Sequence, residues 1–176
     1  MTVAASSAAL RLRQGVRALV AFARPVDWSR AATVLSPEEL ALFRRMRRSE
    51  QLHSLRVLED TQLDPSPVLD KAALLHDVGK SCYPIRLWQR ALPVVVGAIS
   101  PRLMHSLAER DPRPAWSRGF VVHEHHAEWG ADLVAGAGSP ESVVWLVRHH
   151  GDDPARWATH ALYPYLVRLK AADDAN

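Results

Sequence analysis

Nine histidines occur among the 176 residues, and one of them stands beside an aspartate at the end of an apolar run. The run is AALLHDVGKS, residues 72–81, and the pair is His76-Asp77. Imidazole nitrogen and carboxylate oxygen suit Mn, Fe, Co, Ni or Zn better than Ca. A metal centre follows only if further ligands converge on the pair, and the chain offers candidates at His53, His126, His149, His150 and Asp173.

The elements that must carry these residues are expected to be helical nearly throughout, because no convincing alternating strand pattern occurs. Ser36-Pro37-Glu38-Glu39 predicts a helix start, with Ser as N-cap, Pro at N1 and Glu at N3. Gly and Pro residues mark the starts and ends of the later helical segments. We expect helices over 10–23, 36–60, a segment ending near Gly79, a segment after Pro84 kinked or interrupted at Pro93, 121–135, 139–150 and 163–174.

The face of the last helix can be predicted from spacing. Leu162, Leu166, Leu169 and Asp173 follow an i, i+4, i+7, i+11 pattern, so Asp173 continues an apolar stripe. Asp174 falls on a more exposed stripe. A charged carboxylate on an apolar stripe costs several kcal/mol unless it is paired or bound to metal. We therefore prefer Asp173 as a ligand.

Two other helices place histidines in a similar way. Val143, Val147 and His150 share one face. His126 has Gly130 one turn later, and the missing side chain there would let another element approach the histidine.

Each candidate by itself also has a structural explanation. A lone inward histidine is usually a hydrogen-bonded core residue, and a buried His-Asp pair needs no metal. The full set is harder to explain without one, because five different helices contribute to it. Helical bundles build metal sites in this way, from inward-facing side chains on several helices.

The order of these residues resembles the HD superfamily of metal-dependent phosphohydrolases. LLHDVGK is similar to the family signature, in which a His-Asp pair is followed by Gly-Lys. Three further elements resemble the HD-GYP-like branch with two metals: His126-Ala-Glu-Trp-Gly130, Arg148-His149-His150 and Ala172-Asp173. The Gly-Tyr-Pro segment of that branch is absent, because the chain after the double histidine reads GDDPARWATHALYPY.

The resemblance implies an all-α, single-domain helical bundle of the HD type and a site of one or two divalent transition metals. One ion would be held by His53, His76, Asp77 and Asp173. Asp77 would bridge to a second ion, held by His126, His149 and His150. His125 competes with His126 for that role.

The activity that the resemblance implies is phosphohydrolysis, of a monoester or a diester, through a metal-activated water. Asp77 and Lys80 would be the catalytic residues. Lys80 could reach a phosphate oxygen, or it could simply be a lysine favoured at a helix C-terminus. The substrate would be a nucleotide or another small phosphoester. The alternative is a non-catalytic HD-fold module that binds metal or nucleotide and regulates.

Composition bounds the remaining possibilities. The length fits one domain, which we divide into an N-terminal helical extension, 1–35, and an HD domain, 36–176.

The net charge of +3 is no nucleic-acid signature by itself, and the Arg44–Arg48 cluster spans the helix circumference, so no nucleic acid is expected. With a single cysteine, no signal-peptide core and no run long enough to span a membrane, we expect a cytoplasmic protein. A homo-oligomer stays open.

Overall fold

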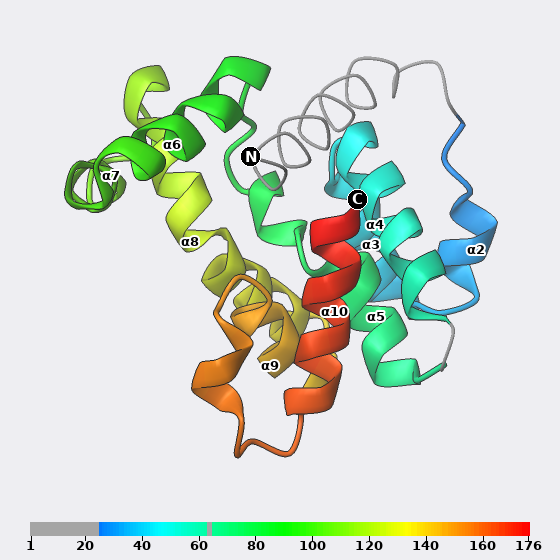
Figure 1. The fold of residues 1–176 in the computed structure, drawn as a ribbon. Coiled ribbons are helices and arrows are strands. Elements are labelled where there is room, and N and C mark those ends of the chain that lie inside the picture. The colour runs from blue at the N-terminus through cyan, green and yellow to red at the C-terminus, as the bar shows by residue number, and fades with distance from the viewer. Residues whose placement is uncertain (1–24, 63–64) are drawn as a thin grey trace.

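The computed structural model describes residues 25–62 and 65–176, and its regular secondary structure there is entirely helical (Figure 1). The predicted all-α class is confirmed. The predicted helix over 10–23 lies outside the described residues. The elements are α2 (Trp28–Ala32), α3 (Pro37–Arg45), α4 (Arg48–Thr61), α5 (Pro67–Leu75), η2 (Val78–Ser81), α6 (Leu87–Ile99), α7 (Pro101–Ala108), α8 (Ala115–Gly136), α9 (Glu141–His149), η3 (Pro154–Trp157) and α10 (Tyr163–Ala175).

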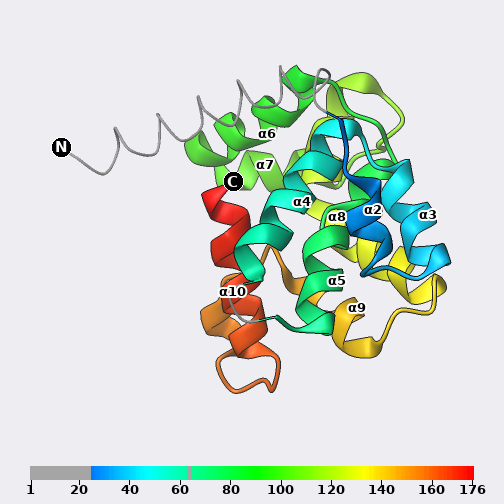
Figure 2. The same ribbon diagram turned by 90° about the vertical axis from the view of Figure 1, so that its right-hand side faces the viewer.

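The long helix α8 extends from the pair α6 and α7 to η2 and α9. It packs against α6 and α7 near its start, and against η2 and α9 further along. Helix α10 lies alongside α4 and α5 (Figure 1 and Figure 2). No helix of the described chain combines the length and apolarity needed to cross a membrane.

One hydrophobic core joins these helices. Its largest fully buried side chains include Phe43, Leu58, Leu74, Leu146 and Leu169, from α3, α4, α5, α9 and α10. Ala31 and Leu35, which precede the predicted domain boundary at residue 36, belong to the same core. That boundary stays a prediction.

The predicted helix start at Ser36 is confirmed, but the helix is shorter than expected. The Ser36 hydroxyl accepts from the Glu39 N–H, and the Glu39 carboxylate accepts from the Ser36 N–H. The expected single helix over 36–60 is wrong, because Met46 and Arg47 are extended and separate α3 from α4. Buried Met46 contributes to the core there, and the Glu50 carboxylate accepts from the Arg47 N–H at 2.9 Å.

Other boundaries also differ from the expectation. Pro93 removes one backbone donor but does not end α6. The chain instead breaks at Ser100, which is extended and caps α7 through its hydroxyl. Helix α8 begins at Ala115, six residues before the expected start at Val121. Helix α5 ends at Leu75, and the separate turn η2 follows before the chain leaves.

The backbones of η2 and α8 approach each other more closely than side chains would allow. A Cβ on Gly79 would lie 1.9 Å from the His126 carbonyl oxygen and 2.7 Å from the Gly130 nitrogen. A Cβ on Gly130 would lie 3.2 Å from the Gly79 nitrogen. The prediction that Gly130 admits another element is confirmed, and that element is η2.

This approach predicts that Gly79→Ala is strongly destabilising. Its methyl group meets backbone, which cannot move aside as a side chain can, so we expect a loss of about 3 kcal/mol of unfolding free energy. Urea denaturation measures it. Gly136→Ala is the matched control, because a Cβ there meets nothing within 4 Å and alanine is the better helix former. A Gly79→Ala protein as stable as the control would contradict the prediction.

Candidate metal centre

Two groups of side chains, which share Asp77, offer ligand atoms that converge. Each group has its nitrogen and oxygen ligand atoms within 4.8 Å of one another. The first consists of His53, His76 and Asp77; the second consists of Asp77, His126 and His150. They come from α4, from the α5–η2 junction, from α8 and from the end of α9.

Asp173 of α10 completes the first group. Its Oδ1 lies 2.8 Å from His53 Nε2 and 3.6 Å from His76 Nε2. The predicted stripe holds, since Leu166 and Leu169 are fully buried on the same helix. Asp174 instead pairs with Lys170 on the exposed side.

Three of the histidines are oriented in the same way by the backbone. Each Nδ1–H donates to a carbonyl of its own helix, which directs Nε2 of the ring at the centre. The acceptors are Ala73 for His76 at 3.0 Å, Val122 for His126 at 3.0 Å and Val147 for His150 at 2.8 Å.

The donor set fits a cation. His126 Nε2 and His150 Nε2 lie 3.3 Å apart, although the Nδ1 bonds make both of them acceptors. His76 Nε2 is buried without a hydrogen-bond partner in the described structure. Acceptors that face each other and an orphaned buried nitrogen are stabilised by a positive ion between them.

The electrostatics of the group reflect the buried carboxylates. Burial alone would lower the pKa of His76, but Asp77 and Asp173 outweigh it and raise that pKa to about 8. Burial opposes ionisation of Asp77, yet Lys80 and His76 hold its pKa well below the ordinary value. Burial, with repulsion from His76, lowers the pKa of His150 to about 3, so His150 is neutral.

Comparison with known proteins agrees with this geometry. The family model described as HD domain matches residues 51–175, which is more than half of the chain. The chain belongs to the HD domain family. Searches of curated proteins and of solved structures gave no significant match. The HD domain places this chain in a superfamily of metal-dependent phosphohydrolases, and the His/Asp groups above are compatible with that assignment.

The choice between His125 and His126 depends on the direction of the two rings. His126 Nε2 lies 3.5 Å from Asp77 Oδ1, whereas the His125 ring stacks on Trp129, with ring centroids 5.8 Å apart. Helix α8 thus directs His126, and not His125, toward Asp77.

His149 is not in either converging group of the described HD domain. Its Nδ1 lies 2.8 Å from Asp152 Oδ2, and its ring packs against Trp145 and Trp157. Asp152 also accepts from the Trp157 indole N–H at 2.9 Å. The predicted role of His149 as a ligand stays a prediction.

Lys80 lies directly beside the shared carboxylate. Its Nζ is 2.6 Å from Asp77 Oδ1 and 2.7 Å from Oδ2. It also lines a cavity of about 200 Å³ together with Arg90 and His123. Sequence reasoning gave His123 no role and did not single out Arg90. Arg90 pairs with buried Glu50, and neither periodicity nor motif spacing could bring those two residues together.

The raised pKa of His76 predicts that the free energy of unfolding of the chelator-treated protein depends on pH. The folded-state pKa of His76 is about 8, and that of an ordinary histidine is 6.5. Protonated His76 therefore stabilises the fold fully below pH 6.5, and this stabilisation is lost as the pH rises through 8. We expect a fall of about 2 kcal/mol across this window, measured by urea denaturation at several pH values. His76→Gln removes the fall and His125→Gln keeps it. An equal fall in all three proteins would contradict the assignment.

Proposed function

We propose that this protein is a metal-dependent phosphohydrolase acting on a nucleotide or another small phosphoester. The observation that carries the proposal is the convergence of His53, His76, His126 and His150 on Asp77, with Asp173 beside the first two. A structural core histidine pairs its ring N–H with an acceptor and its other ring nitrogen with a donor. Here three Nδ1 atoms are already paired, and their Nε2 atoms still face a shared carboxylate.

The same residues would hold the metal. We assign His53, His76, Asp77 and Asp173 to one ion, and Asp77, His126 and His150 to a second, with Mn, Fe, Co, Ni or Zn as the fitting metals. Such ions supply Lewis acidity toward a phosphoryl oxygen and hydroxide at neutral pH.

The chain itself contributes orientation and charge. The carbonyl bonds orient three histidines so that Nε2 of each ring faces the centre. Lys80 places an ammonium at the edge of the centre and in the adjoining cavity, where it can offset the charge of a phosphate. His123 lines the same cavity and adds hydrogen-bonding capacity there.

A second candidate is a regulatory module that keeps the HD fold without turnover. The contact between Lys80 and both oxygens of Asp77 favours it, because the ammonium neutralises the carboxylate that an ion would need. The two candidates differ in whether the protein hydrolyses a phosphoester.

Metal analysis joined to an activity assay tests the proposal. We expect close to two transition-metal equivalents in protein purified without chelator, and hydrolysis of model phosphomonoesters or phosphodiesters with added Mn. Asp77→Asn should lose metal and reduce kcat/KM by at least about 100-fold, because the shared ligand is gone. His125→Gln is the matched control and should retain both.

The outcomes separate the candidates. Metal without turnover on a broad phosphoester panel supports the regulatory module. No metal after reconstitution with Mn, Fe, Ni and Zn contradicts the phosphohydrolase and favours the module without turnover. In the same assay His149→Gln tests the remaining predicted ligand: loss of one equivalent supports that role, and full retention contradicts it.

Lys80→Ala gives a separate prediction. If the ammonium meets the substrate phosphate, the variant should retain its metal and lose about tenfold or more in kcat/KM. Removal of a positive charge beside Asp77 cannot weaken attraction between that carboxylate and a cation. Lys170→Ala, on the exposed side of α10, is the control. Unchanged kcat/KM in Lys80→Ala would contradict the catalytic role.

A further inference from the structure

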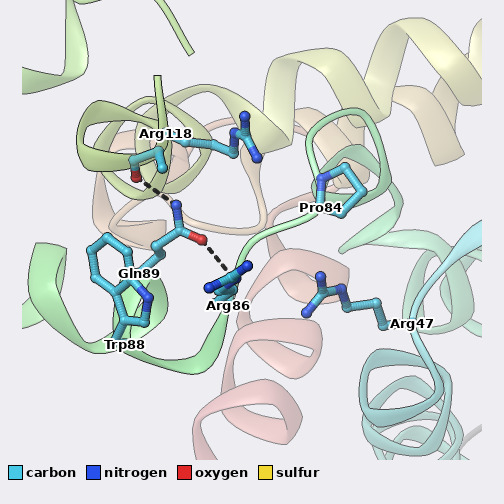
Figure 3. Close-up of a pocket in the computed structure, with 7 residues that line it drawn as sticks. Arg47, Pro84, Arg86, Trp88, Gln89 and Arg118 are labelled. Atoms are coloured by element: carbon cyan, nitrogen blue, oxygen red, sulfur yellow. Dashed lines mark hydrogen bonds between the residues drawn. The ribbon is translucent and has the colours of Figure 1, made fainter. Parts of the chain in front are cut away.

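A second cavity, separate from the metal centre, is lined by three arginines. It has a volume of about 260 Å³ and lies where the starts of α4 and α6 meet α8 (Figure 3). Figure 3 shows Trp88 on one side and Arg47 on the other, with Arg86 and Arg118 also lining the space. It shares no lining residue with the cavity at Lys80.

No carboxylate lines this cavity within the described chain. Arg47 and Arg86 are exposed, and the ion pairs of residues 25–62 and 65–176 include neither guanidinium. Arg118 donates through Nε to the Pro112 carbonyl at 3.0 Å, a contact that orients the guanidinium without neutralising it. Three like charges around one small space repel one another, and a bound anion would relieve that repulsion.

The walls of the cavity are held in place by contacts that involve no ligand. Gln89 is 3% exposed; its amide oxygen accepts from the Arg86 N–H at 2.6 Å, and its amide nitrogen donates to the Ala115 carbonyl. Gly119 lets α8 pack directly on α6, since a Cβ there would lie 2.2 Å from the Gln89 carbonyl oxygen. The start of α6 is therefore fixed against α8, and binding would require little ordering of the backbone.

The chemistry of the lining indicates the ligand. The planar guanidinium offers parallel N–H donors that match phosphate oxygens, so arginine is the residue suited to bind phosphate in two-point contacts. The start of α6, a helix of 13 residues, adds the positive end of its dipole. Trp88 is 48% exposed and presents an aromatic surface on which a planar ring can stack.

We propose that this cavity binds a nucleotide, with its phosphates among Arg47, Arg86 and Arg118 and its base on Trp88. The site is distinct from the metal centre, and its occupancy does not require hydrolysis. The arginines recognise the anion, and the indole recognises the ring that accompanies it, so the two contributions can be measured separately.

Calorimetric titration of the full chain in excess chelator tests this, with GDP, ADP and inorganic pyrophosphate as the three ligands. We expect saturable binding of one ligand per chain. Arg86→Ala and Arg47→Ala should weaken all three at least about tenfold, because each removes a charged donor pair. Trp88→Ala should weaken GDP and ADP severalfold and leave pyrophosphate unchanged.

Matched controls come from the same end of the molecule. Arg102→Ala removes an exposed arginine of α7, and Trp116→Ala removes an indole that is 56% exposed; neither residue lines the cavity. Asp77→Asn reports on the metal centre. All three should bind as the wild type does.

Three results would overturn the proposal. The first is no saturable binding of any of the three ligands. The second is an equal loss in Arg102→Ala and Arg86→Ala, which means unspecific attraction to positive charge. The third is binding that Asp77→Asn abolishes and Arg86→Ala preserves, which places the anion at the metal centre.

Discussion

The structure depends on one buried carboxylate. Asp77 is 4% exposed and sits at the junction of α5, η2 and α8, where an unpaired negative charge would cost several kcal/mol. Lys80 and three histidines surround it, each with a nitrogen within 3.8 Å of a carboxylate oxygen. The raised pKa of His76 and the lowered pKa of Asp77 are two consequences of the same arrangement. A divalent ion would satisfy the carboxylate with neutral histidines as its companions.

Helix ends explain why the histidines point inward. His76 and His150 are the C-cap residues of α5 and α9, and each donates its Nδ1–H to the carbonyl three residues earlier. Carbonyls in the last turn of a helix have no partner within that helix, so a polar group must satisfy them. The contact satisfies an orphan acceptor and at the same time leaves Nε2 free for the centre. One constraint of helix geometry thus serves folding and also turns Nε2 of both rings toward Asp77.

The segment at the start of α6 contributes lining residues to both cavities. Ile85 and Arg90 line the cavity beside Lys80, while Arg86 and Gln89 line the one with three arginines. Buried Glu50 joins the start of α4 to α6. Its carboxylate accepts from the Arg47 N–H and from the Arg90 guanidinium. A ligand bound between Arg47 and Arg86 would therefore contact the same short segment that carries Arg90, which lines the cavity beside Lys80.

The amino-acid sequence by itself determined the helical class, the helix start at Ser36 and the inward face of Asp173, because each depends on neighbours within one helix. Periodicity and capping are local, and the HD order of ligands could be read along the chain. Only the tertiary structure decided the break at Met46, the approach of His126 to Asp77 and the meeting of Arg47 with Arg86. Adjacent histidines on one helix differ in direction by about 100°. Which one reaches Asp77 therefore depends on where α8 lies against η2, and that position is set by contacts between residues far apart in the chain.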